Sequence, residues 1–120
     1  EQLKKLPNFN ARRREIAERY NSELSDIVTT PKNRRGHVFH QYTIRCNKRD
    51  ELREFLLNRK INTGIYYPTL LYNYPSMADY QSSCPNAEIL IKEVLSLPVH
   101  PALSDSDVFE IISSIKAFFK

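Results

Sequence analysis

The sequence predicts an α+β fold, a two-layer sandwich in which helices cover a small, mostly antiparallel sheet. Two observations lead to this prediction. Apolar residues recur at helical spacing in four segments, and three short segments that predict strands lie between them. Because these strands are few and short, antiparallel or mixed pairing is favoured over parallel pairing. A length of 120 residues is enough for one domain.

Four helices are expected. The first covers residues 1–24, where Pro7 either kinks the helix or begins a new one because it lacks an N–H. The second covers residues 47–60 and has an asparagine cap at its start. The third begins at Pro85, since proline suits a first helical turn, and the last begins with a Ser-x-x-Asp capping box at residues 104–107.

Three strands are expected between these helices. Residues 37–45 give the clearest prediction, because they are dense in β-branched and aromatic side chains. Both faces of this segment carry apolar and polar groups, so the strand is expected to lie between two covered surfaces. Residues 63–67 and 95–97 predict two shorter strands, each followed by a proline that ends it.

Charge and composition argue against several functional classes. The chain has 18 Lys and Arg against 14 Asp and Glu, and its basic run at residues 12–14 lies beside Glu15 and Glu18. Balanced charges at this spacing indicate a solvated helix face, so no nucleic acid is expected as a partner. No apolar run approaches the roughly 18 residues of a membrane span, and the first residues lack the apolar core of a secretory signal. No membrane partner is therefore expected, and we expect the protein to be cytoplasmic.

Common catalytic and metal-binding motifs are missing from the sequence. Two glycines cannot make a glycine-rich phosphate loop. His37 and His40 lie three residues apart, which on a strand turns them to opposite faces, so no metal site is expected. Cys46 and Cys84 are expected to be free thiols, with a single disulfide between them as the alternative.

The start of the chain predicts that these residues are part of a larger protein. The only methionine is Met77, and the chain opens on helix-type sequence with no capping residue ahead of it. Removal of a long leader is the alternative explanation.

Tyrosines are concentrated in one region. Tyr66 and Tyr67 end a short predicted strand, and Tyr72, Tyr74 and Tyr80 follow in an irregular segment. Strand ends and the loops after them often carry binding groups, and tyrosine combines an apolar ring with a hydroxyl group. The alternative is an aromatic surface buried against another domain or subunit, and composition alone favours that alternative.

Four segments carry a resemblance to a known family, in the same order and with similar spacing across nearly the whole chain. They are Asn10–Tyr20 (NARRREIAERY), His37–Arg45 (HVFHQYTIR, followed by RDEL at 49–52), Gly64–Pro68 (GIYYP), and Pro85–Pro101, which includes EVLSLP. Together they resemble the C-terminal part of the DegT/StrS-type aminotransferases, which place amino groups on nucleotide-linked keto sugars.

The resemblance implies that residues 1–120 are the C-terminal small domain of a fold type I enzyme that uses pyridoxal phosphate. Residues 1–24 would be the helix that joins this domain to a large domain, which holds the cofactor and the lysine that forms its Schiff base. None of Lys4, Lys5, Lys60, Lys92 and Lys116 lies in the family's lysine motif, so no catalytic residue is expected here. The resemblance also implies a nucleotide-sugar substrate, an amino-acid donor (usually glutamate) and a homodimer.

The same resemblance points to substrate-binding residues. The family's usual His-Tyr-Pro segment, which lines the sugar-nucleotide site, reads Tyr66-Tyr67-Pro68 here. Tyr66 and Tyr67 are therefore expected in the cleft, with His40 and Tyr42 as weaker candidates on the matching strand. Tyrosine in place of histidine keeps a hydrogen-bonding group but loses an imidazole that can carry charge near neutral pH, which points to a different sugar or an altered activity.

Two other functions stay open on the sequence alone. The sugar dehydratases of the same family have histidine in place of the lysine, and this chain does not contain the position that distinguishes them. A regulatory or protein-interaction module, without catalytic groups, is the alternative from a different functional class.

Overall fold

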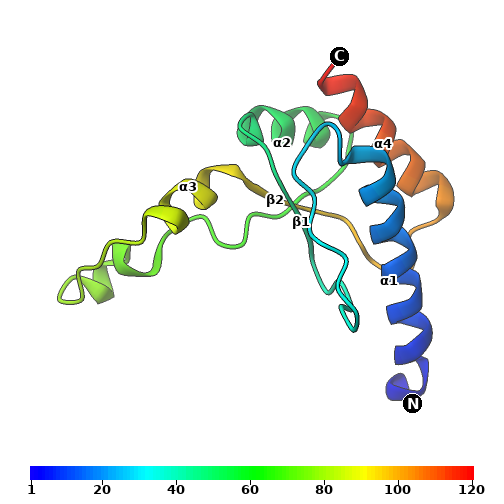
Figure 1. The fold of residues 1–120 in the computed structure, drawn as a ribbon, viewed down its shortest axis with the longest axis horizontal. Coiled ribbons are helices and arrows are strands. Elements are labelled where there is room, and N and C mark those ends of the chain that lie inside the picture. The colour runs from blue at the N-terminus through cyan, green and yellow to red at the C-terminus, as the bar shows by residue number, and fades with distance from the viewer.

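The computed structural model describes residues 1–120 and confirms the α+β fold. Its regular elements are α1 (Gln2–Leu24), β1 (Tyr42–Arg45), α2 (Arg49–Asn58), η1 (Leu71–Asn73), η2 (Pro75–Met77), α3 (Pro85–Glu93), β2 (Val94–Leu97) and α4 (Asp105–Phe118). Figure 1 shows that α1, α2 and α4 gather around the crossing strands, whereas α3 and the short 3-10 helices project to one side. None of the helices combines the length and the apolar character that crossing a membrane would require.

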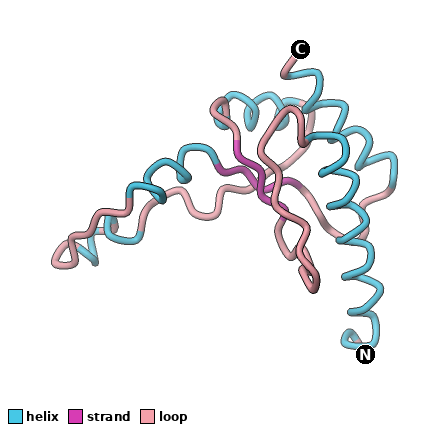
Figure 2. The backbone as a smooth tube through the Cα atoms, in the orientation of Figure 1, coloured by secondary structure: helices cyan, strands magenta, loops and turns pink.

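The sheet is smaller than the sequence predicts. β1 pairs antiparallel with β2, with Tyr42 opposite Leu97, and this pair lies at the centre of the molecule (Figure 2). The strand expected at residues 37–45 is reduced to its last four residues, because Phe39 has a φ of 46°, which no extended strand accommodates. The antiparallel pairing itself is confirmed.

The strand expected at residues 63–67 is reduced to a single bridge. Gly64 exchanges two backbone hydrogen bonds with Ser96, at 3.0 and 2.7 Å. Beyond Gly64 the chain turns away from β2, and Pro68 has no N–H to offer a neighbouring strand. The pairing of Gly64 with Ser96 is therefore all that joins this segment to the sheet.

Helix α1 runs without a break through Pro7, so a new helix does not begin there. Residues 1–9 are all exposed, and α1 joins the core only from Ile16 onward. Helix α2 also differs from the prediction in its cap: Lys48 precedes the helix and no side chain caps it. The helical character of both segments was predicted correctly, and the asparagine cap of the second helix was not.

The core consists of nineteen buried apolar side chains drawn from α1, α2, α4, both strands and the connecting loops. Tyr20 of α1, Ile44 of β1, Leu52 of α2 and Ile115 of α4 are all fully buried in it. Helix α3 contributes none. Its apolar stripe, which the helical spacing predicts to be buried, is only partly covered. The reason is that α3 lies outside the body, the part of the molecule in which α1, α2, α4 and the two strands surround the core.

Polar contacts hold α1 to the rest of the body. The Tyr20 hydroxyl donates to the carbonyl of Pro98 at 2.7 Å. Arg12 and Arg19 contact the same Asp105 carboxylate, at 2.8 and 3.1 Å. The hydrogen bond from Arg12 and the charge of Arg19 keep the pKa of Asp105 below its ordinary value. These contacts align α1 with the start of α4.

The capping box expected at the start of α4 is confirmed. The backbone N–H of Asp107 donates to Ser104 Oγ at 3.1 Å, and the backbone N–H of Ser104 donates to Asp107 Oδ2 at 2.8 Å. Hydrogen bonds from Ser104 lower the pKa of the Asp107 carboxyl. A carboxylate whose pKa is lowered in the folded state stabilises the fold above its ordinary pKa and loses that effect as the pH falls.

We expect Ser104→Ala to lower the free energy of unfolding by about 1 kcal/mol at neutral pH, because one helix cap is removed. The difference from the parent protein should narrow as the pH falls below 3.8, the ordinary carboxyl pKa, where Asp107 becomes protonated. Urea denaturation followed by circular dichroism measures both effects. Ser113→Ala, in the same helix but outside the cap, is the control, and equal losses in the two variants would contradict this prediction.

Candidate functional site

Residues 65–93 form a projection that we call the arm. It leaves the body just after the Gly64–Ser96 bridge and returns to it where α3 runs into β2 (Figure 1). The radius of gyration of the whole chain is 16.1 Å, whereas a compact chain of this length has about 14 Å. The arm and the exposed first turns of α1 are the parts that extend beyond the body.

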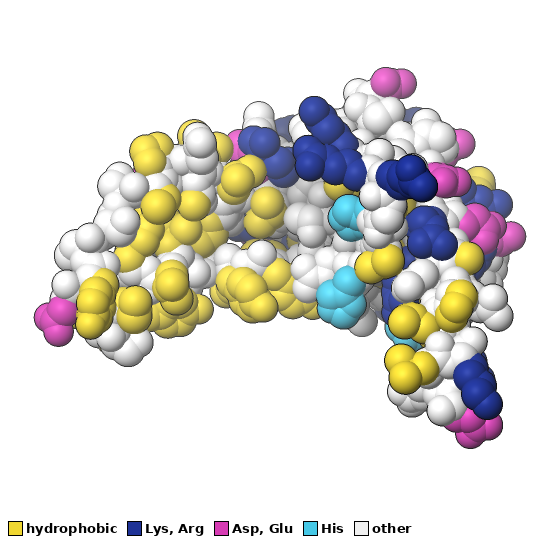
Figure 3. All heavy atoms as spheres, turned by 60° about the horizontal axis from the view of Figure 1, so that its bottom comes forward, with side chains coloured by type: hydrophobic (Ala, Val, Ile, Leu, Met, Phe, Trp, Pro, Cys, Tyr) yellow, Lys and Arg dark blue, Asp and Glu magenta, His cyan; other side chains and the backbone are white.

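The arm is unusually apolar on its surface. Six of its large side chains are exposed: Tyr66 (52%), Tyr67 (73%), Leu71 (70%), Tyr74 (41%), Tyr80 (68%) and Ile89 (53%). Figure 3 shows these apolar side chains spread along the arm. Between the segment at 66–74 and the inner face of α3 lies a groove of about 630 Å³, the arm groove, lined almost wholly by apolar residues. Exposed apolar surface on this scale marks a place of contact with a ligand or another protein surface.

Two arginines of the body hold the end of α3 in place. The buried Arg49 guanidinium donates from Nη1 to the carbonyls of Ile91 and Val94, at 3.0 and 3.1 Å, and from Nε to Asp50 at 2.6 Å. These carbonyls lie at the C-terminal end of α3, where a cation is favoured by the helix dipole. Arg45 adds an ion pair with Glu93 at 2.7 Å. The position of the arm therefore depends on side chains from β1 and α2.

A second depression, the polar hollow, has a volume of about 370 Å³. Its lining comes from α1, the residues just before β1, the segment that leads into the arm, and the end of β2 with the loop after it: Arg13, His40, Gln41, Asn62, Thr63, Gly64, Tyr66, Ser96, Leu97, Pro98, Val99 and His100. Tyr66 lines both the polar hollow and the arm groove. Its side chain is thus the boundary between an apolar and a polar surface.

Gly64 makes the position of Tyr66 possible. The Tyr66 ring lies so close to Gly64 that a Cβ atom there would be 2.5 Å from Tyr66 Cε2 and 2.7 Å from its hydroxyl oxygen. No carbon–carbon contact of 2.5 Å is tolerated, so any side chain at position 64 would displace the ring. The ring is held against the backbone bridge that joins the arm to β2.

The structure brings together three of the four residues expected in the cleft. Tyr66 and Tyr67 are exposed at the base of the arm, and His40 is exposed at the polar hollow. Tyr42 is different. It is fully buried, its hydroxyl donates to Asn21 Oδ1 at 2.6 Å, and burial raises the pKa of its phenol.

The expectation that Tyr42 contacts a ligand is therefore corrected, because its side chain packs in the core against Tyr20. Arg13 and His100 line the polar hollow, although no sequence motif singled them out as binding residues. The only signal available was that each lies within a segment that carries the family resemblance.

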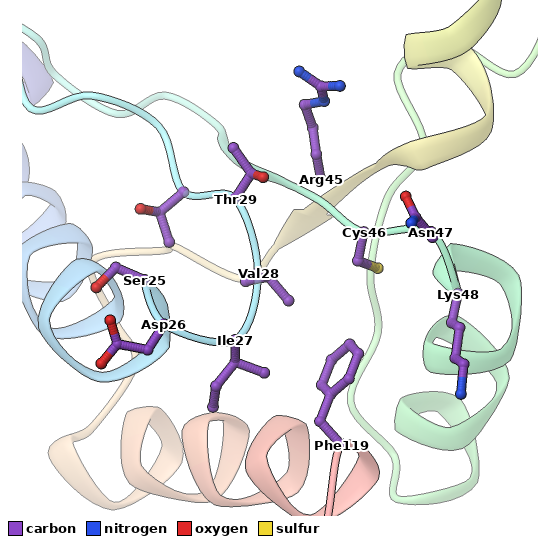
Figure 4. Close-up of a pocket in the computed structure, with 11 residues that line it drawn as sticks. Ser25, Asp26, Ile27, Val28, Thr29, Arg45, Cys46, Asn47, Lys48 and Phe119 are labelled. Carbon is purple, nitrogen blue, oxygen red and sulfur yellow. The ribbon is translucent and has the colours of Figure 1, made fainter.

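A third hollow, of about 670 Å³, lies between the end of α1 and the loop that precedes α2 (Figure 4). Cys46 lies on its wall, and burial raises the pKa of this thiol, so that it is less available as a thiolate. Cys46 and the exposed Cys84 are both free. No group of three His, Cys, Asp or Glu side chains is placed to hold a metal ion.

Comparison with known proteins agrees with the geometry around the arm. Residues 1–116 match the DegT/DnrJ/EryC1/StrS aminotransferase family. The chain belongs to this family. The resemblance read from the four sequence segments is confirmed.

Members of the DegT/DnrJ/EryC1/StrS family resemble the chain over nearly its whole length. A pleiotropic regulatory protein of Geobacillus stearothermophilus is 40% identical, over 96% of this chain and 33% of the relative. A dTDP-4-dehydro-2,3,6-trideoxy-D-glucose 4-aminotransferase of Saccharopolyspora spinosa is 36% identical, over 89% of this chain and 29% of the relative. The crystal structure of DesV from S. venezuelae, in complex with a ketimine intermediate, has a TM-score of 0.92 at 31% identity, over 98% of this chain and 34% of DesV.

The chain thus spans about a third of the length of these relatives, and it matches the C-terminal portion of their sequences. The family depends on pyridoxal phosphate. Neither the arm groove nor the polar hollow contains a lysine or a carboxylate. The residues around Tyr66 therefore do not fit this cofactor on their own, because they offer no amine for a Schiff base and no acid for the pyridine nitrogen.

We expect Arg49→Leu to loosen the arm, because the Ile91 and Val94 carbonyls lose their donor. An unsatisfied group of this kind costs about 1–3 kcal/mol, so amide hydrogen exchange in α3 should accelerate about tenfold or more. The core of α1 and α4 should change little. Arg53→Leu removes an exposed arginine from the same helix and serves as the control. Unchanged exchange in α3 of the Arg49 variant would show that the arm is held in another way.

Proposed function

We propose that residues 1–120 are one domain, the C-terminal small domain of an aminotransferase that acts on nucleotide-linked keto sugars with the help of pyridoxal phosphate. The whole protein would serve deoxyamino-sugar or polysaccharide biosynthesis. The observation that carries this proposal is the family match over residues 1–116 together with the exposed Tyr66–Tyr67 edge at the base of the arm. This chain would supply a wall of the substrate cleft, and the rest of the protein would supply the reacting groups.

Tyr66, Tyr67 and His40 are the side chains that we propose to contact the sugar nucleotide. Both tyrosines present a ring face and a hydroxyl group to solvent, so they can pack against a sugar or a base and also hydrogen-bond a polar substituent. His40 lies beside Tyr66 at the polar hollow and adds a nitrogen donor or acceptor. Tyr42 would not contact the substrate, because its side chain is buried in the core.

Tyr66 stands where the family usually has histidine, and it is a neutral hydrogen-bonding group in place of an imidazole. The longer phenol ring also occupies more of the space above Gly64. Both differences alter the edge against which a sugar ring would rest. We propose that this position helps to select the sugar.

The chemistry of amino transfer would come from the large domain, whose lysine carries the cofactor. Residues 1–24 would form the helix that joins the two domains. The exposed apolar side chains of Leu3, Leu6 and Phe9 support this role, since an isolated surface helix has little use for them. The amino donor, by analogy with the family, would be glutamate.

The exposed apolar face of the arm supports a further part of the proposal, that this protein acts as a homodimer. The six exposed side chains on the arm would be covered by the large domain or by the second subunit, which removes their apolar surface from water. A cytoplasmic location belongs to the same proposal, because nucleotide sugars and glutamate are available there.

The alternatives from the sequence are less well supported. The relatives named for an activity are transaminases, so they do not favour a sugar dehydratase or a module without enzymatic function. The residue at the lysine position of the full-length protein distinguishes the first alternative directly, because the dehydratases carry histidine there.

The deciding experiment uses the full-length protein that contains this chain. Incubated with pyridoxal phosphate, it should develop the absorbance of a lysine-bound cofactor, and with glutamate it should aminate a nucleotide-linked keto sugar. Residues 1–120 alone should do neither, because they lack the lysine at the site. A full-length protein with no cofactor absorbance and no suitable lysine would disprove the proposal.

We expect Tyr66→Phe in the full-length enzyme to raise KM for the nucleotide sugar about threefold to tenfold, since a neutral hydrogen bond contributes about 0.5–1.5 kcal/mol. Steady-state kinetics measures the change. Tyr80→Phe removes the same hydroxyl from an exposed tyrosine that lines neither the arm groove nor the polar hollow, and its KM should match that of the parent. The same KM in both variants and the parent would remove Tyr66 from the substrate site.

A further inference from the structure

The polar hollow has an uneven distribution of charge. Arg13, His40 and His100 line it, and no aspartate or glutamate does, although the chain has 14 acidic residues. Asn62 and Thr63 add an amide and a hydroxyl group. Histidine side chains are visible on the face where the arm meets the body (Figure 3). The hollow is therefore rich in hydrogen-bond donors and contains no fixed negative charge.

Arg13 has no carboxylate partner, unlike Arg12 and Arg19 on the same helix. Arg12 contacts Glu15 at 2.9 Å and Asp105 at 2.8 Å, and Arg19 contacts Asp105 at 3.1 Å. The Arg13 guanidinium makes one hydrogen bond, from Nη1 to the neutral Asn10 Oδ1 at 3.1 Å. Its charge is not neutralised within the chain, and most of its N–H groups remain free to donate. A planar guanidinium with free N–H groups matches the geometry of a carboxylate or a phosphate.

His100 brings a second free donor to the polar hollow. Its Nδ1 accepts the backbone N–H of Ala102 at 3.1 Å, so in the neutral ring the proton lies on Nε2. The Nε2–H has no acceptor within the chain, and the residue lines the hollow. Arg13 thus lines the hollow from α1 and His100 from the loop after β2, and no acid is among the lining residues.

We propose that the polar hollow binds an oxyanion of a reactant, with Arg13 and His100 as its donors. This inference rests on the proposed function and deepens it, because Tyr66 is shared by the hollow and the arm groove and so places the anion next to the sugar. Two reactants carry a suitable group: the diphosphate of the nucleotide sugar and a carboxylate of the amino donor. Both offer two or more oxygens to a guanidinium fork.

The experiment titrates the full-length protein with two probes, inorganic pyrophosphate and glutarate, by isothermal titration calorimetry. Arg13→Gln should weaken binding of one of them roughly tenfold, the loss that accompanies removal of a charge-assisted hydrogen bond. Weaker pyrophosphate binding identifies the diphosphate as the ligand, and weaker glutarate binding identifies the donor carboxylate. Arg14→Gln, which removes the same charge from the same helix but does not line the hollow, should bind both probes as the parent does.

A second variant guards against a loss caused by misfolding. His100→Asn keeps an acceptor for the Ala102 N–H and removes the Nε2 donor, and it should weaken the same probe while leaving the circular dichroism spectrum unchanged. Arg13→Lys should recover part of the affinity.

Equal binding of both probes in the Arg13 variant, the Arg14 variant and the parent would overturn the inference, as would a parent that binds neither probe. Because binding requires no turnover, the result is independent of amino transfer. A protein without transaminase activity whose anion binding depends on Arg13 would refute the proposed function and keep the anion site.

Discussion

The backbone pairing of Ser96 joins the two parts of this molecule. On one side Ser96 exchanges two hydrogen bonds with Gly64, at the base of the arm, and on the other side β2 pairs with β1 in the middle of the body. Its hydroxyl also hydrogen-bonds the Thr43 hydroxyl at 2.8 Å. The arm, the arm groove and the polar hollow all begin at this point. Two short strands are enough to form a stable sheet here because the helices of the body bury their side chains in the core.

The body and the arm satisfy different requirements. Every buried side-chain nitrogen and oxygen in the chain has a hydrogen-bond partner, and nineteen apolar side chains close the core of the body. The arm is held by Arg49 and Arg45, yet its large apolar side chains are left in solvent. The buried polar side chains are therefore fully hydrogen-bonded within the chain, whereas a large part of its apolar surface is left uncovered. Satisfied polar groups in the core, together with exposed apolar side chains on the arm, are expected of a domain that packs against another domain or subunit on the side of the arm.

Local signals in the sequence were sufficient for much of this fold. The Ser104–Asp107 capping box and the helical spacing of α1 depend on residues close together in the chain, and both were predicted correctly. The strand at residues 37–45 was predicted too long, because a left-handed backbone at Phe39 leaves no mark in composition. The partial exposure of α3 was missed for a related reason: periodicity identifies an apolar face but not the surface that covers it.

The candidate site also contains residues that the sequence could single out and residues that it could not. Tyr66 and Tyr67 were singled out as candidates because they stand in a recognisable segment and end a predicted strand, and the structure leaves both exposed. Tyr42 was assigned to the site from its place in a motif, and the structure places it in the core because alternation put its side chain on the inward face of β1. Arg13 and His100 meet only after the chain has folded, so no spacing in the sequence could have associated them.

The close contact between Tyr66 and Gly64 also bears on how this site can evolve. With the Tyr66 ring in its present position, residue 64 has no room for a Cβ, whereas a shorter side chain at 66 would free that space. The two positions are thus linked, because a side chain at position 64 would have to be accompanied by movement or replacement of the ring at position 66. A lineage that keeps the ring in this position gives up the choice of side chain two residues away.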